Sequence, residues 1–227
     1  MSKEKKNKIN VKESSLTNIK QYILAEELMN AISHGIGFLL AIAGTVVGIV
    51  FAAKTGRPIA VVSMAVYGTT LMLLYLVSTL YHSLTNPKAK RVFKVLDHAS
   101  IFVLIAGCYT PPMLVGFGGA LGWSYFGIIW GLAIVAVTLS SISLEKFKKI
   151  NIILCLIMGW LIAFQIPRYI EVIGMKSMVF MLIGGIMYSI GVIPYKLKKY
   201  RFTHALWHLF VLAGSIFQYF AILEILK

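Results

Sequence analysis

Apolar residues run through this chain in long blocks, and short polar clusters separate the blocks. A helix needs about 20 apolar residues to cross the hydrocarbon of a bilayer. The longest block, 98–144, has no formally charged residue over 47 positions, and as one helix it would be roughly 70 Å long. Its glycine-rich stretch, 116–122, is therefore expected to divide it into two spans. The pattern predicts seven membrane-spanning helices, near 29–52, 59–83, 97–115, 121–143, 150–167, 177–195 and 202–224.

The composition agrees with a membrane protein and excludes two other classes. Of the 227 residues, 59% are hydrophobic and only 13% are charged, whereas soluble domains carry roughly 25% charged residues. So few charges exclude an ordinary soluble domain, and the high hydrophobicity excludes an intrinsically disordered chain. We expect an all-α fold, a seven-transmembrane helical bundle over residues 26–227, preceded by a basic tail over residues 1–25.

The placement of lysine and arginine predicts how the chain is oriented. The net charge is +14, but the positive residues cluster between apolar blocks, so no nucleic-acid partner is expected. With the N-terminus inside, 17 Lys and Arg residues lie on the cytoplasmic side and 5 lie outside. This split predicts a cytoplasmic N-terminus and an external C-terminus. The tail has no apolar core typical of a cleaved signal peptide, and its lysines suit contact with anionic lipid headgroups.

Small residues form a stripe along the first predicted span, at Gly37, Ala41, Gly44 and Gly48. Their spacing of three or four positions places them on one face of a helix. Such a face lets a neighbouring helix approach closely in a membrane. We expect it to be a contact between helices of the bundle.

Ionisable residues inside a span are costly, and several here are expected to converge on one membrane level. The predicted topology places His82 at the cytoplasmic end of the second span. It places Asp97, the only aspartate in the chain, at the start of the third span on the same side. His204 and His208 lie in the first two turns of the seventh span, which also begins inside. These residues are therefore expected to meet near the cytoplasmic face.

The types and spacing of these residues suggest a metal site. His204 and His208 are four positions apart, which places both imidazoles on one helix face and lets them share a metal ion. With His82 they would supply three ligands and leave a position open for water, the pattern of a catalytic zinc site. Ser78 precedes His82 by the same spacing, and Asp97 is the best candidate for a general base. Simpler roles stay open, namely interhelical hydrogen bonds for the histidines, a bond to its own helix for Ser78, and a helix cap for Asp97.

A second polar face lies on the first predicted span. Glu27, Asn30 and His34 recur at helical spacing and point into the bundle together. They could hold the metal-ligand side chains in place through contacts to them, or they could only make contacts between helices. His98 follows Asp97 directly and points about 100° away from it around the helix, which favours a packing or interfacial role.

Four motifs contain these residues: EELMNAISHG (26–35), STLYH (78–82), DHASIF (97–102) and HALWH (204–208). In their order and spacing they resemble the bacterial hemolysin III family, which belongs with the progestin and adipoQ receptors and includes the adiponectin receptors among its relatives. The resemblance covers residues 26–223. One mild departure is Ser33, where the family pattern has threonine.

The resemblance implies a site and a location. His82, His204 and His208 would be zinc ligands, Asp97 would hold the zinc-bound water, and Ser78 would lie beside the metal. The chain would be a multi-pass protein of the bacterial plasma membrane. Related receptors and alkaline ceramidases suggest hydrolysis of a lipid amide, so that membrane lipids would be the substrates.

Three functions follow as hypotheses, and they leave open whether the protein is an enzyme. The leading one is a zinc-dependent membrane hydrolase of lipid amides or esters that takes part in membrane lipid homeostasis. The second is a non-enzymatic receptor or sensor of membrane state, in which zinc is structural. The third is a cytolysin that forms haemolytic pores, which fits poorly with a fixed seven-span topology.

Overall fold

The computed structural model describes the backbone of residues 3–197 and 200–227, and the side chains from residue 21 onward within those ranges. Regular structure in this part of the chain is helical, and seven spans are long and apolar enough to cross a membrane, which confirms the predicted fold class. The elements are α1 (Lys3–Lys54), α2 (Pro58–Ser83), α3 (Pro87–Pro111), the π-helix η1 (Pro112–Phe117), α4 (Gly119–Ile142), α5 (Leu144–Trp160), the 3-10 helix η2 (Leu161–Gln165), α6 (Ile166–Val172), α7 (Met175–Lys196) and α8 (Thr203–Ile225).

Two helices begin earlier than their apolar blocks, for reasons that the sequence contains. α1 starts at Lys3 and runs through most of the region expected as a tail, and no proline or glycine precedes Gly35 to interrupt it. α3 starts at Pro87, because the Asn86 side chain accepts hydrogen bonds from the first backbone N–H groups and proline suits the first helical position. Asp97 therefore lies well inside α3, and its alternative role as the cap of that helix is wrong.

The predicted break within the longest apolar block is present. Helical structure passes from α3 into η1 and stops at Gly118, which has φ 60° and ψ −166°. Gly119 follows with φ 52°, also in the region that favours glycine. The chain reverses there into α4, so 116–122 does separate the third and fourth spans.

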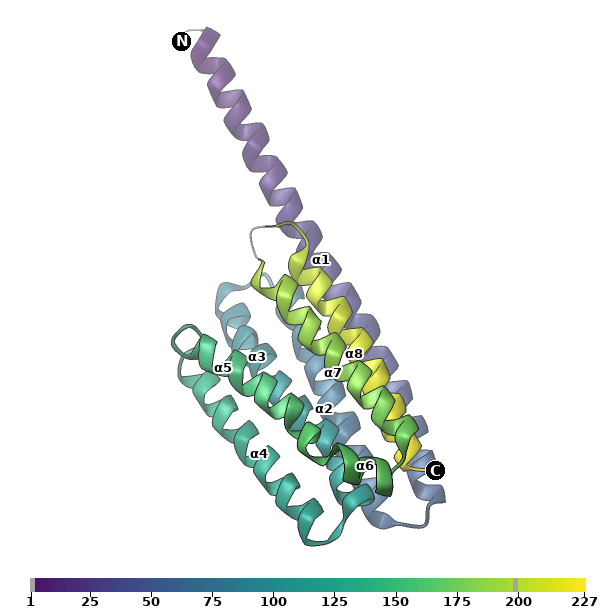
Figure 1. Ribbon diagram of the computed structural model, residues 1–227. Coiled ribbons are helices and arrows are strands. Elements are labelled where there is room, and N and C mark those ends of the chain that lie inside the picture. Colours follow the sequence, from purple (N-terminus) through teal and green to yellow (C-terminus); the bar gives the residue numbers. More distant parts are fainter. Residues whose placement is uncertain (1–2, 198–199) are drawn as a thin grey trace.

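The seven spans form one bundle (Figure 1), in which α1, α7 and α8 lie along one side and α4 and α5 along the other. The third span is the central one, with 72% of its most apolar window buried inside the protein, whereas the fifth span has 11% buried. α3 contacts α2, α4, α5 and α8. Residues on α3 can therefore reach side chains from several other helices.

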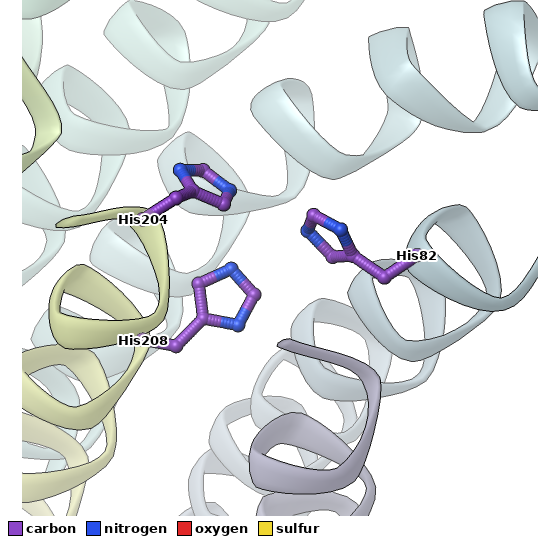
Figure 2. A group of neighbouring side chains, drawn as sticks. All are labelled: His82, His204 and His208. Atoms are coloured by element: carbon purple, nitrogen blue, oxygen red, sulfur yellow. The ribbon is translucent and has the colours of Figure 1, made fainter. Parts of the chain in front are cut away.

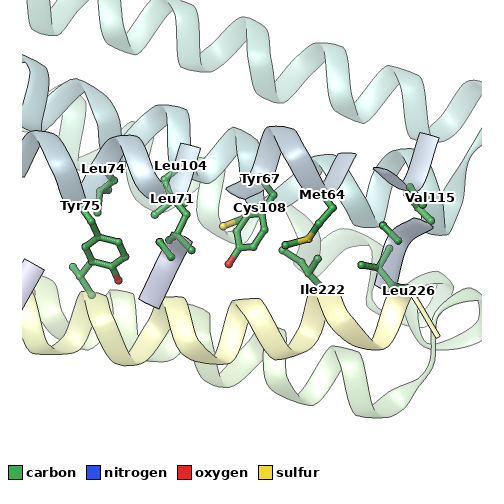
Figure 3. Close-up of a cluster of buried hydrophobic side chains, with 14 residues drawn as sticks. Met64, Tyr67, Leu71, Leu74, Tyr75, Leu104, Cys108, Val115, Ile222 and Leu226 are labelled. Carbon is green, nitrogen blue, oxygen red and sulfur yellow. The ribbon is translucent and has the colours of Figure 1, made fainter. Parts of the chain in front are cut away.

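The small-residue stripe of α1 packs as predicted. A Cβ on Gly37 would come within 2.7 Å of the Tyr75 ring, and one on Gly48 would come within 2.2 Å of Met64. Only glycine lets α1 and α2 approach this closely at those two positions. Tyr75 and Met64 belong to a buried cluster from α1, α2, α3 and α8 (Figure 3), which holds the helices that carry the polar motifs.

The fifth span is interrupted within the bundle, where α5 gives way to η2. Backbone groups freed by such a break must find partners, because the hydrocarbon of the bilayer supplies none. The Tyr109 hydroxyl from α3 accepts a hydrogen bond from the Ile162 N–H at 2.8 Å and donates one to the Gly159 carbonyl at 3.3 Å. One buried phenol thus compensates for the break.

Candidate metal centre

Three histidines from two helices meet at one end of the bundle. His82 lies in the last turn of α2, and His204 and His208 lie in the first two turns of α8. One ring nitrogen of each can be chosen so that the three atoms all lie within 4.8 Å of one another. The rings face a common space between the helices (Figure 2), and His82 and His208 are buried while His204 is partly exposed. The predicted convergence of these residues is therefore present in the structure.

The His82 ring is held from behind by α1. Nδ1 of His82 lies 2.8 Å from Oε2 of Glu27, and the Asn30 amide nitrogen lies 3.4 Å from the same ring atom. The shorter contact to a carboxylate places the ring proton on Nδ1, which leaves the Nε2 lone pair free. Nε2 is buried and has no hydrogen-bond partner in the described part of the chain. A buried nitrogen lone pair beside two other imidazoles is the arrangement that a metal ligand requires.

Glu27 has a second partner that sequence reasoning missed. Its Oε1 lies 3.0 Å from Nζ of Lys90 on α3, while Oε2 holds His82. The ion pair is partly buried, with 31% and 29% of the two side chains exposed. Lys90 therefore helps to orient the carboxylate toward the histidine. In the sequence it is one of a cluster of loop lysines, and nothing in its spacing sets it apart.

His34 supports a different ligand, through ring stacking. Its ring lies against that of His208, with the centroids 3.6 Å apart and the planes 18° apart. On another side it meets the Tyr75 ring edge-on, at a centroid distance of 5.0 Å. His34 is 3% exposed, so this packing leaves little room for the His208 ring to rotate.

Ser78 and Asp97 lie beside the histidine cluster. Ser78 is one turn before His82 on α2 and is 1% exposed. The Asp97 carboxylate on α3 lies 3.7 Å from Nδ1 of His98 and close to Ser78 and His82, and its side chain is 15% exposed. A carboxylate and a hydroxyl thus meet next to three imidazoles, from three different helices.

The start of α8 is anchored to α1 by a contact that the sequence did not indicate. Phe202, the residue before α8, is the only non-glycine residue with positive φ in the described chain, at 58°. Its N–H donates to the Tyr22 hydroxyl at 3.1 Å, and that hydroxyl donates to Glu26 at 2.8 Å. The rings of Tyr22 and Phe202 also pack edge-to-face, and Arg201 lies over the Tyr22 ring. This contact helps to fix the start of α8 and, with it, the position of His204.

Two adjoining pockets lead from the cluster into the bundle. The rim pocket lies between α3, α5, α7 and α8, and its wall includes Asp97 and His204. The inner pocket is almost wholly apolar and reaches as far as Gln218 on α8. Both share four residues of their walls: Ile101, Cys155, Val192 and Trp207. An elongated apolar molecule could therefore lie in the inner pocket with its polar end at Asp97 and His204.

The sequence predicted a packing or interfacial role for His98. In the structure His98 lines the rim pocket. Its Nδ1 lies 2.8 Å from the Lys94 carbonyl of its own helix, and its Nε2 lies 3.5 Å from the Tyr195 hydroxyl on α7. The pocket extends around this part of α3, so both Asp97 and the residue after it reach its wall.

The donor set fits a zinc ion. Three imidazoles, one of them held by a carboxylate at its second ring nitrogen, are a protein contribution typical of catalytic zinc sites. The fold and the site together define a seven-helix membrane protein with a candidate three-histidine metal centre at one end of its bundle.

Comparison with known proteins identifies the family. Residues 22–219 match the family described as Haemolysin-III related. The chain is 43% identical to Hemolysin-3 of Bacillus cereus, over 92% of this chain and 94% of that protein. It is 41% identical to a Hemolysin-3 homolog of Bacillus subtilis (strain 168), over 89% and 95% of the two chains. The chain therefore belongs to the hemolysin III family and is a multi-pass protein of the bacterial cell membrane.

A more distant relative supports the wider relationship that the motifs indicated. The human Monocyte to macrophage differentiation factor is 28% identical over 163 residues, which cover 69% of this chain and 67% of that protein. This similarity supports the wider superfamily of adiponectin receptor-like proteins.

Proposed function

We propose that this protein is a zinc-dependent hydrolase of lipid amides or esters, with its site at the cytoplasmic end of the bundle. The observation that carries the proposal is the meeting of three histidine nitrogens within 4.8 Å of one another beside the Asp97 carboxylate. The orientation follows from the charge pattern, in which 17 of 22 Lys and Arg residues fall on that side.

Zinc bound by His82, His204 and His208 would lower the pKa of a coordinated water to about 7 and polarise a substrate carbonyl. The chain's own groups would do the rest. Glu27 holds His82 in the tautomer whose Nε2 is free, and His34 restrains His208. The ligands are therefore preorganised, which avoids the cost of ordering them when the metal binds.

Asp97 would move the proton. Its carboxylate accepts a proton from the attacking water as the new bond forms between the water oxygen and the carbonyl carbon. It then returns the proton to the leaving amine or alcohol as the old bond to carbon breaks. The Ser78 hydroxyl, next to Asp97, can orient the water or donate a hydrogen bond to the oxygen that becomes negative.

The adjoining pockets support a lipid as the substrate. The inner pocket offers an apolar wall to a hydrocarbon chain, and the rim pocket brings the polar end of that molecule to Asp97 and His204. A substrate that enters from the bilayer would keep its tail in an apolar environment throughout, so little hydrophobic stabilisation would be lost on binding.

The test is a measurement of zinc content and lipid hydrolysis on the purified protein. We expect one zinc per chain in the wild type and a loss of most of it when His204 and His208 are both changed to alanine. Asp97→Asn should keep the zinc but hydrolyse a lipid amide about 10²–10⁴-fold more slowly. An Asp97→Asn protein as active as the wild type would contradict the role of Asp97 as the base.

Two outcomes would favour the other functions. Zinc retained together with no cleavage of any lipid amide or ester would favour a receptor or sensor with structural zinc. Dye release from liposomes that continues after both histidines of α8 are changed would favour a cytolysin, the activity named in the relatives Hemolysin-3.

A further inference from the structure

Two lysines stand in the wall of the rim pocket, close to the candidate catalytic carboxylate. Lys94 is on α3, one helical turn before Asp97, and Lys148 is on α5 across the pocket. One turn of helix places Lys94 about 5 Å closer to the end of the bundle than Asp97. The rim pocket therefore has a part near Asp97, where the proposed reaction occurs, and an outer part, nearer the end of the bundle, that carries ammonium groups.

Neither lysine is firmly engaged by a carboxylate. Lys148 makes no ion pair within the residues that the structure describes. Lys94 is 3.5 Å from Glu145, but these two side chains are 41% and 79% exposed. Exposed ion pairs of this kind contribute little, so a ligand that binds better can replace Glu145. Both ammonium groups are available to an anion in the pocket.

The other carboxylate of the rim pocket does not cancel this charge at the outer end. Asp97 lies one helical turn farther along α3, where Nδ1 of His98 is 3.7 Å from its carboxylate and His82 is also close. The outer part then contains two ammonium groups and the single carboxylate of Glu145. Its positive balance lies about one helical turn from Asp97.

We propose, on the basis of the proposed hydrolase function, that the rim pocket selects lipids whose leaving group carries an acidic function a few bonds from the scissile bond. N-acyl amino acids have this chemistry, because the carboxylate is separated from the amide nitrogen by one carbon. Water adds its oxygen to the acyl carbon, the C–N bond breaks, and the amine takes up the proton. The products are a fatty acid and an amino acid, and Lys94 and Lys148 bind the carboxylate throughout.

The simpler explanation is that these lysines only set the membrane topology. Lys148 belongs to a cluster with Lys146 and Lys149, and all three count toward the cytoplasmic charge excess. Of these three, Lys148 alone lines the rim pocket. The adjacent Lys149 is exposed and gives a matched control, since its change to glutamine removes the same charge from the same turn of α5.

The experiment compares two ligands that differ only in the acidic group. N-dodecanoylglycine and N-dodecanoylethanolamine share the chain and the amide, and each carries its polar oxygen on the second carbon from the nitrogen. We expect the metal-loaded wild type in detergent to bind the glycine conjugate about tenfold more tightly, the size of a charge-assisted hydrogen bond. Lys148→Gln should reduce most of this preference, Lys149→Gln should keep it, and Glu145→Gln should increase it by releasing Lys94.

The outcomes separate this proposal from the hydrolase function on which it rests. Equal affinity for the two ligands, or a preference that Lys148→Gln and Lys149→Gln leave equally intact, would overturn the selection by the rim lysines. A preference that disappears on chelation of the metal but not in Lys148→Gln would also overturn it, because the carboxylate would then bind the metal. A preference carried by Lys148 with no cleavage of either ligand would leave the selection standing and contradict the hydrolase function.

Discussion

The Glu27 carboxylate on α1 lies 2.8 Å from Nδ1 of His82 on α2. The contact joins residues that are 55 positions apart, and Lys90 holds the other carboxylate oxygen from a third helix. A metal-binding histidine commonly donates its second N–H to a carboxylate, which fixes the tautomer and makes the ligand nitrogen more basic. Three helices thus determine which nitrogen of one imidazole faces the other two histidines.

Glu27→Gln should weaken zinc binding by about 10–100-fold while the protein stays folded. The amide keeps the shape of the side chain but loses the charge that holds the Nδ1 proton and pairs with Lys90. Zinc affinity is measured by competition with a chelator. Glu171→Gln is the matched control, since Glu171 is 68% exposed and pairs only with Arg168 among the described residues. An unchanged zinc affinity in Glu27→Gln would mean that this carboxylate only ties α1 to α2.

Substitutions of His34 can separate a packing role from a polar role, because a phenylalanine ring can also stack on the His208 ring. If His34 acts by restraining the His208 ring, His34→Phe should keep zinc affinity within about threefold of the wild type. His34→Ala leaves a void beside a ligand and should destabilise the protein by roughly 2–4 kcal/mol as well as weaken zinc binding. Zinc loss in His34→Phe as large as in His34→Ala would instead assign a polar role to the His34 nitrogens.

Tyr22→Phe should destabilise the start of α8 by roughly 0.5–1.5 kcal/mol. The substitution keeps the ring that packs on Phe202 but removes the hydroxyl that accepts from the Phe202 N–H and donates to Glu26. Unfolding is followed in detergent, and zinc affinity is measured alongside it. Tyr200→Phe serves as the control, since that side chain is 63% exposed and nearby. The same change in both variants would remove the anchoring role of Tyr22.

The membrane orientation is tested with reporter fusions. A periplasmic alkaline phosphatase fused after Lys227 should be active, and the same enzyme fused after Asn86 should be inactive, because 17 of the 22 Lys and Arg residues favour the cytoplasm on the Asn86 side. A cytoplasmic reporter should give the opposite pair of results. Activity of the phosphatase at Asn86 alone would place the histidine cluster on the outer face.

Much of the architecture was predictable because its signals are local. Hydropathy is summed over about 20 neighbouring residues, so the seven spans could be found without knowing how they pack. Chain direction alternates from one span to the next, which brought the segments that carry His82, Asp97 and His204 to one membrane level. The spacing from His204 to His208 is a property of one helix and needs no tertiary information.

Helix ends were less accurate where polar residues continue a helix beyond its apolar block. α3 begins at Pro87 rather than near residue 97. The Asn86 side chain and the proline supply the start signal, and a search for apolar residues does not register it. The consequence is functional, because an Asp97 inside the helix is no cap.

The sequence alone therefore determined the number of membrane spans, the membrane level at which the polar residues lie, and which residues are available at that end of the bundle. The rotation of each helix about its axis depends on close packing, such as the fit of Gly37 against Tyr75 and of Gly48 against Met64. Only that rotation decides that Glu27 meets His82 rather than lipid. The contacts of Lys90 and Tyr22, and the place of Lys148 in the wall of the rim pocket, were decided by the tertiary structure for the same reason, since each depends on helices whose mutual orientation no local pattern encodes.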